Sequence, residues 1–152
     1  MKLAEALILR ADRKKRLELL RGRLTRVAKV QEGDLPVEDP AALLDEADRV
    51  TADLTRLIKQ VNLTNSTVRL SDGRTIADAI ADRDGLRTRH MLLTNVIDAA
   101  VIKQDRFTKS EVRYQTTVDV AALQQRVDDL ARAYRELDTL IQSANWLVDL
   151  IE

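Results

Sequence analysis

The last quarter of the chain carries apolar residues that alternate steps of three and four without interruption. The series comprises Val120, Leu123, Val127, Leu130, Tyr134, Leu137, Ile141, Ala144 and Val148. This spacing places side chains on one face of a helix that packs along another helix. Leu140 and Leu147 widen the face, so we expect this helix to contact two neighbours. Asp119 is placed to cap its first turn.

An earlier segment has the same periodicity. Its apolar residues are Leu43, Ala47, Val50, Leu54, Leu57 and Val61. Asp39 is placed as an N-cap and Pro40 suits the first helical position, so a helix is predicted to begin there. Residues 2–30 form a further, less regular helix, and Gly33 and Pro36 mark the loop that follows it. A short loop predicts that these two helices lie antiparallel.

A third long helix is predicted from Ile76 to about Ile102, because Thr75 and Asp78 have the spacing of a capping box. Its apolar face consists of Ile76, Ala79, Ile80, Leu86, Leu93, Ile97 and Ala100. Helices of roughly 22 to 29 residues would each be about 33 to 43 Å long. The predicted fold is therefore all-α: an elongated four-helix bundle that occupies residues 1–152 as a single domain.

Two short segments, residues 67–70 and 112–118, alternate with the period of a β-strand. Asp72 and Gly73 follow the first segment and are a strong turn signal. We expect a small two-stranded β element, formed either within the chain or between subunits. The residues assigned to this assembly ribbon are Val68, Leu70, Val112, Tyr114 and Thr116.

Composition restricts the chemistry and the compartment. The chain has no cysteine, which excludes disulfides and thiolate metal sites. It also lacks a signal-peptide pattern and an apolar window long enough to span a membrane, so a soluble, cytoplasmic protein is expected. Residues 1–30 hold ten Lys/Arg against three Asp/Glu, and residues 31–60 hold three against eight. We expect the basic first helix to lie against the acidic second helix.

Two arginines interrupt the apolar face of the first helix. Arg10 and Arg13 lie about as far from the start of their helix as Asp82 and Asp84 lie from the start of theirs. In an up-down-up-down bundle the first and third helices run parallel, so these charges would meet at one level. The sequence thus predicts an internal polar layer that fixes the register between helices or subunits.

No pattern predicts a catalytic residue, a cofactor or a metal ligand. His90 is the sole histidine and lacks the carboxylate or histidine spacing of a metal site, so a packed or surface side chain is expected. A magnesium-dependent nucleotide hydrolase is an alternative that would use acidic groups at helical spacing. Those groups are Asp45, Glu46, Asp48, Asp78, Asp82 and Asp84.

Several short motifs are distributed over the whole chain, namely Met1–Leu7, Arg13–Leu17, Val30–Asp34, Glu38–Pro40, Asn62–Asn65, Asp72–Thr75, Asp105–Phe107 and Val118–Ala121. Together they resemble an uncharacterised family of bacterial helical proteins, some of which are labelled septicolysin. The resemblance implies a helical bundle that oligomerises, and it supplies no catalytic residues. The label itself implies a pore-forming cytolysin.

We therefore predict a homo-oligomer, most simply a dimer, that acts as a structural or protein-interaction module without catalytic activity or cofactor. A long bundle with few aromatic residues leaves part of its apolar surface uncovered, and symmetric association would bury it. Three alternatives remain open: a membrane-active, septicolysin-like cytolysin, a nucleic-acid binder that uses the basic first helix, and the metal-dependent nucleotide hydrolase. Contact with nucleic acid or membrane is not expected.

Overall fold

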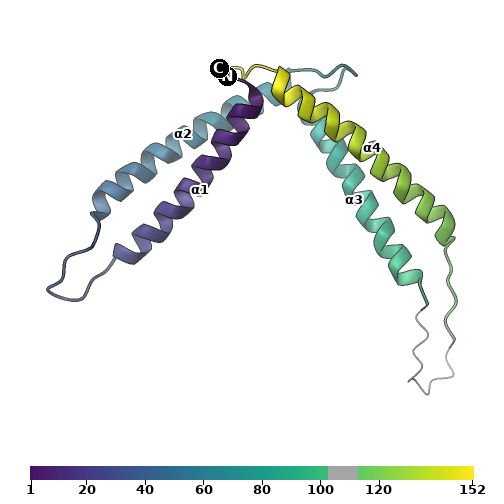
Figure 1. The fold of residues 1–152 in the computed structure, drawn as a ribbon, viewed down its shortest axis with the longest axis horizontal. Coiled ribbons are helices and arrows are strands. Elements are labelled where there is room, and N and C mark those ends of the chain that lie inside the picture. The colour runs from purple at the N-terminus through teal and green to yellow at the C-terminus, as the bar shows by residue number, and fades with distance from the viewer. Residues whose placement is uncertain (103–112) are drawn as a thin grey trace. The chain divides into compact units, whose positions relative to one another are not determined.

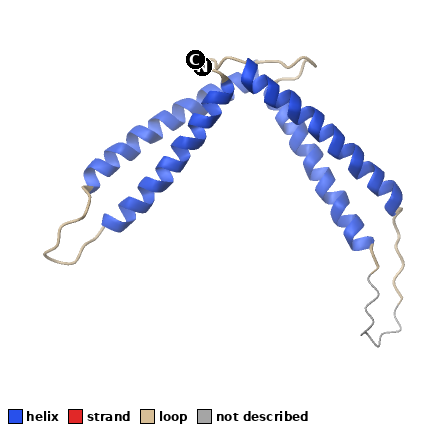
Figure 2. Ribbon diagram, viewed as in Figure 1, coloured by secondary structure: helices blue, strands red, loops and turns tan. Residues whose placement is uncertain are grey.

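The computed structural model describes residues 1–102 and 113–152 of the chain. It contains four helices (Figures 1 and 2), namely α1 (Leu3–Val27), α2 (Pro40–Thr67), α3 (Ile76–Ala100) and α4 (Val120–Leu147). The all-α fold class predicted from the sequence is confirmed. Among the described helices, none combines the length and the apolar character that a membrane span requires.

The chain divides into two compact units. Unit 1 comprises Met1–Ile76 together with Ser143–Glu152, so it contains α1, α2 and the end of α4. Unit 2 comprises Ala77–Gln142 and contains most of α3 and α4. The assignment of residues 1–152 to a single domain stays a prediction.

The core of unit 1 lies between α1 and α2, which run side by side (Figure 1). Leu20, Val27 and Leu43 are buried together, and Leu24, Ala47 and Val50 pack against them. Leu43, Ala47 and Val50 belong to the apolar series predicted for the second of these helices. Complete burial of a leucine side chain stabilises a fold by roughly 1.5–3 kcal/mol, so this small cluster holds the hairpin together.

The ends of α1 and α2 follow the expected capping chemistry. Asp39 accepts a hydrogen bond from the Ala41 N–H at 3.0 Å, and Pro40 occupies the first turn of α2. At the start of α1, the Glu5 carboxylate accepts the Lys2 N–H at 2.7 Å. Between the helices Gly33 adopts a φ of 93°, a left-handed conformation that favours glycine.

Helix α2 continues to Thr67, beyond Val61 where the apolar spacing of the sequence fades. The residues from Asn62 to Thr67 are therefore helical, although the apolar series in the sequence ends at Val61. Thr64 is fully buried and continues the seam three residues after Val61. A threonine in a seam position hides the periodicity, because only apolar residues reveal it.

A tight turn connects α2 to α3. Gly73 donates to the Leu70 carbonyl at 3.0 Å, and the Leu70 N–H donates to the Arg74 carbonyl at 2.8 Å. Gly73 has a φ of 88°, which explains the Asp-Gly signal. The Asp72 carboxylate accepts hydrogen bonds from the Arg74 side chain and backbone, and these lower the pKa of Asp72.

The predicted two-stranded β element is not seen, since residues 1–102 and 113–152 contain only isolated bridges. Val68 accepts the Ile76 N–H at 3.1 Å, so the residues after the turn pair with those before it. Tyr114 and Thr116 lie in an irregular segment, and Val112 lies outside the described residues. The turn satisfies these backbone groups locally, which leaves no need for a distant strand.

In unit 2, α3 and α4 run side by side (Figure 1). Leu93 of α3 and Val127 and Leu137 of α4 are buried. Asp119 caps α4 as expected, because its carboxylate accepts the Ala122 N–H at 3.0 Å. Asp119 therefore predicted the start of α4, and the uninterrupted apolar periodicity predicted its buried face.

Candidate functional site: charged helix faces and exposed apolar residues

Ion pairs join the basic helix α1 to the acidic helix α2. Arg16 Nε donates to Glu46 Oε1 at 2.7 Å. Arg23 Nε lies 3.1 Å from both carboxylate oxygens of Glu38, in the loop that precedes α2. The earlier residue of α1, Arg16, contacts the later acid, and the later residue, Arg23, contacts the earlier acid, as expected for an antiparallel hairpin. The predicted apposition of basic and acidic helices is confirmed.

The Arg23 and Glu38 pair shifts the titration of both partners. The hydrogen bonds from Arg23 lower the pKa of Glu38 below its ordinary value of 4.5, and the same contact raises the pKa of Arg23. A lowered carboxyl pKa in the folded state means that the unfolded chain binds more protons near that pH. The pair therefore favours folding above pH 4.5, and this contribution is lost as the pH falls further.

Replacing Glu38 with Gln should remove part of the acid sensitivity of the fold. The wild-type unfolding temperature is expected to decline as the pH falls below 4.5, and that of Glu38→Gln should decline less steeply. Thermal unfolding followed by circular dichroism across this pH range measures both slopes. Glu18→Gln is the control, because Glu18 contacts Arg21 within one exposed turn of α1. Identical slopes for wild type and Glu38→Gln would contradict the prediction.

Both ends of the chain meet at α2 within unit 1. The Leu3 N–H donates to the Val148 carbonyl at 3.0 Å, and the Leu150 N–H donates to the Met1 carbonyl at 2.9 Å. Lys2 Nζ lies 2.9 Å from the Asp149 carboxylate and lowers the pKa of Asp149.

Thr64 of α2 completes this closure. Its hydroxyl donates to the Gln60 carbonyl at 2.8 Å and accepts the Ile151 N–H at 2.9 Å. Thr64 is fully buried, so its hydroxyl provides a polar contact inside an otherwise apolar seam. The sequence could have indicated Thr64 as a polar residue at a seam position, but it could not indicate a contact 87 residues away.

Arg13 points towards α2, where its Nε lies 3.9 Å from an Asp53 carboxylate oxygen. That Nε is buried and has no hydrogen-bond partner among the described residues. Arg13 and Asp53 line a cleft of about 390 Å³ together with Arg56 and Glu152. Charges of both signs line the cleft, so it shows no preference for an anion or a cation.

The members of the predicted polar layer belong to different units. Arg10 and Arg13 lie in unit 1, whereas Asp82 and Asp84 lie in unit 2. Within its own unit, Asp84 receives hydrogen bonds from Arg83 at 3.0 and 3.2 Å. The layer itself therefore stays a prediction.

Arg83 is the charged residue that sequence reasoning missed. One of its terminal nitrogens donates to Asp138 of α4 at 2.9 Å, which ties α3 to α4. Burial alone would lower the pKa of Arg83, but the hydrogen bonds to Asp84 and Asp138 outweigh burial and raise it. Arg83 stands between Ile80 and Leu86 in the apolar face of α3. In the sequence, a cation at a position of this apolar face was the signal that could have identified Arg83.

His90 is half-buried on α3. It lines a shallow groove of about 300 Å³ with Arg87, Tyr134 and Arg135. Within residues 1–102 and 113–152, no group of three or more His, Cys, Asp or Glu side chains is arranged to hold a metal ion.

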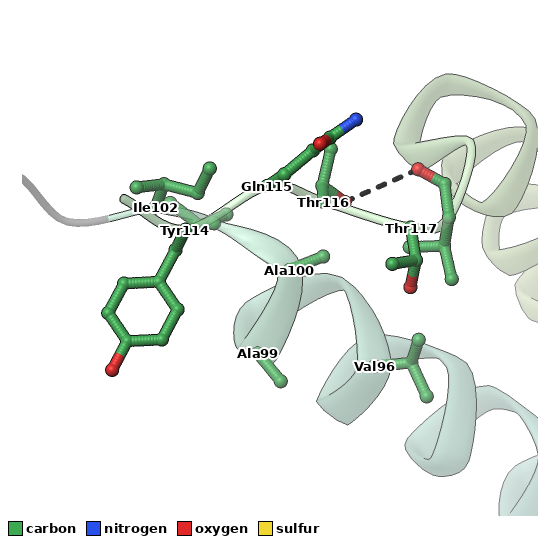
Figure 3. Close-up of a pocket in the computed structure, with 10 residues that line it drawn as sticks. Val96, Ala99, Ala100, Ile102, Tyr114, Gln115, Thr116 and Thr117 are labelled. Carbon is green, nitrogen blue, oxygen red and sulfur yellow. Dashed lines mark hydrogen bonds between the residues drawn. The ribbon is translucent and has the colours of Figure 1, made fainter. Parts of the chain in front are cut away.

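A second cleft, of about 400 Å³, lies where the end of α3 meets residues 114–118 (Figure 3). None of the ten residues that line it is charged, and they include Tyr114 and Thr116 of the predicted ribbon. The Thr116 hydroxyl donates to the Val118 carbonyl at 3.4 Å. Tyr114 is 78% exposed, and Figure 3 shows its ring directed away from Thr116 and Thr117. The cleft offers apolar contact and hydroxyl groups but no catalytic group.

Large apolar side chains remain exposed on the helices of both units. In unit 1 these are Ile8, Leu19, Leu44, Leu63, Trp146 and Leu147, and in unit 2 they are Met91 and Leu92. Contiguous patches of exposed apolar side chains mark surfaces that interact with other molecules, whereas single ones are common on any protein surface.

Comparison with known proteins gives a family without an assigned activity. Residues 10–150 match the family of unknown function DUF6847. A functionally unknown conserved protein from Corynebacterium diphtheriae, solved by crystallography, is similar to this chain, with a TM-score of 0.92 and 39% identity over 99% of each chain. No curated protein matches the sequence, and neither similarity supports the septicolysin label. The chain belongs to the DUF6847 family.

Proposed function

We propose that the protein is a non-catalytic interaction module that assembles with further copies of itself, most simply as a dimer. The observation that supports the proposal is the exposure of large apolar side chains on helices that already have one buried face. Met91 and Leu92 are 55% and 58% exposed on α3, and Ile8 and Leu19 are more than half exposed on α1.

The energetics favour covering these surfaces. Burying a fully exposed side chain of this size stabilises an association by roughly 1.5–3 kcal/mol, and a half-exposed one gains about half as much. Association costs an estimated 4–15 kcal/mol in lost freedom of motion. A two-fold interface buries the same residue in both copies, so the gain from each position counts twice. Two or three exposed apolar residues per chain are then enough to offset an association cost in the lower part of this range.

The distribution of charge favours self-association over nucleic-acid binding. Arg16 and Arg23 direct their guanidinium groups to Glu46 and Glu38 of the same chain. A cation neutralised within the hairpin releases fewer counterions on contact with a phosphate backbone, which weakens that alternative.

Light scattering coupled to size-exclusion chromatography tests the proposal. The expected mass is about twice the 17.2 kDa of one chain, and it should persist at high salt because apolar burial is the driving force. A mass of one chain over the whole accessible range of protein concentration would overturn the proposal.

A further inference from the structure

Helix α3 carries a second stripe of residues opposite its buried face. It consists of Ala77, Ala81, Gly85, Thr88, Leu92, Asn95 and Ala99, and every one of them is exposed. These residues follow one another in steps of three and four, so they share one face of the helix. The stripe contains no charge, although a third of the chain is charged. We call it the outer stripe of α3.

Gly85 lies in the interior of α3, where glycine destabilises a helix. A Cβ built at this position meets no atom of the described chain within 4 Å, so no internal contact requires a glycine. Small residues allow two helix backbones to approach closely. The outer stripe therefore has the shape of a helix-packing surface that lacks its partner.

Charged residues flank the outer stripe in a regular order. Asp84 and Arg87 lie on one flank, and Asp82 and Arg89 lie on the other. On each flank the carboxylate comes before the cation. The midpoint of the set lies between residues 85 and 86, so the acids lie on one side of it along the helix and the arginines lie on the other.

Grooves between α3 and α4 run along both flanks. One groove, of about 520 Å³, is lined by Arg89, Leu92, Leu130 and Arg126, with Asp129 as its acid. The other is the groove of Arg87, His90 and Arg135, which contains no acid. Both grooves are apolar with basic rims. Arg87 and Arg89 therefore lie at the two edges of α3, between the outer stripe and α4.

We propose that two copies of the chain associate through the outer stripe, with their α3 helices antiparallel around a two-fold axis near Leu86. The inference rests on the proposed self-association and names its surface. Antiparallel pairing brings Gly85 opposite Thr88 of the other copy, and Ala81 opposite Leu92. The apolar residues at the centre of each stripe then cover one another.

The same arrangement pairs the flanking charges. Asp84 reaches Arg87 of the other copy, and Asp82 reaches Arg89 of the other copy. Asp84 is 59% exposed beside Arg83, so its carboxylate has room for a second cation. In a parallel arrangement residues at the same level face one another, so Arg87 would face Arg89 of the other copy and Asp84 would face Asp82, and like charges would meet. Charge complementarity therefore selects the antiparallel orientation.

A steric substitution tests the surface. Gly85→Leu places a large side chain at the closest approach and should raise the dissociation constant of the dimer by about tenfold or more. Gly22→Leu is the matched control, because Gly22 is an exposed glycine inside α1 that is equally open. Sedimentation across a dilution series measures both constants, and circular dichroism verifies that both variants keep their helices. The control should keep the wild-type constant.

A charge exchange tests the orientation. Asp84→Arg and Arg87→Asp should each weaken self-association, and an equimolar mixture of the two variants should restore a dimer that contains one chain of each. In a parallel pair Arg87→Asp would instead remove the repulsion from Arg89 of the other copy and lower the dissociation constant. Native mass spectrometry identifies the mixed dimer directly.

The outcomes separate this inference from the proposed function. A wild-type dimer that is unaffected by Gly85→Leu and by both charge variants would overturn the α3 interface and leave self-association intact. A monomeric wild type would overturn both. A lower unfolding temperature of Gly85→Leu at unchanged mass would also overturn the interface, because the stripe would then contact its own chain.

Discussion

Replacing Leu20 with alanine is expected to lower the free energy of unfolding by about 2–5 kcal/mol. Leu20 is fully buried between α1 and α2, where it packs with Val27 and Leu43. The cluster has few members, so little surrounding structure is available to collapse into the space left by the leucine. We therefore expect a value in the upper part of this range.

Leu19→Ala provides the control for this experiment. Leu19 is the adjacent residue of α1 and is 51% exposed, so the same chemical change removes much less buried surface. Urea denaturation of both variants yields the two free energies, and sedimentation of both variants at the same protein concentration shows whether their association differs. Similar losses for Leu19→Ala and Leu20→Ala would show that the cluster is not the core of the hairpin.

The elements with regular apolar spacing could be predicted from the sequence. Asp39 and Pro40 indicated the start of α2, and Asp119 indicated the start of α4, because capping depends on neighbouring residues alone. The buried residues of α4 were also predicted, since a seam of threes and fours allows a single buried face. Local chemistry was sufficient in each case.

The alternating segment at residues 67–70 was misread, and the reason is physical. Val68 and Leu70 alternate because they enter a tight turn, in which Leu70 is buried and Arg69 bonds to the Gly73 carbonyl at 2.7 Å. A period of two describes any short extended segment, whether or not it belongs to a sheet. The turn residues Asp72 and Gly73 were the more reliable signal.

The polar contacts between distant segments could not be predicted. Arg83 contacts Asp138 across 55 residues, and Lys2 contacts Asp149 near the opposite end of the chain. In a chain with 25 cations and 25 acids, the sequence alone does not select these pairs from the alternatives. Packing geometry selects them, because the apolar seams determine which charges come within reach.

Replacing Thr64 with valine should cost about 1–3 kcal/mol of stability, because the Ile151 N–H would lose its acceptor in a partly buried contact. Valine keeps the branched shape of threonine, so the seam between Val61 and the chain ends stays filled. The hydroxyl is the only group removed. We also expect faster hydrogen exchange of the Ile151 amide, since its partner is gone.

Thr51→Val isolates the contribution of that single contact. Thr51 lies on α2 and donates to the Ala47 carbonyl at 2.7 Å, as Thr64 donates to Gln60, but it is exposed and accepts no bond from the chain end. The difference between the two variants therefore measures the bond from Ile151. If both valines cost the same, and the Ile151 amide exchanges at its wild-type rate in Thr64→Val, then Thr64 does not hold the chain ends together. A larger loss at Thr64 would show that this buried hydroxyl joins the C-terminus to α2.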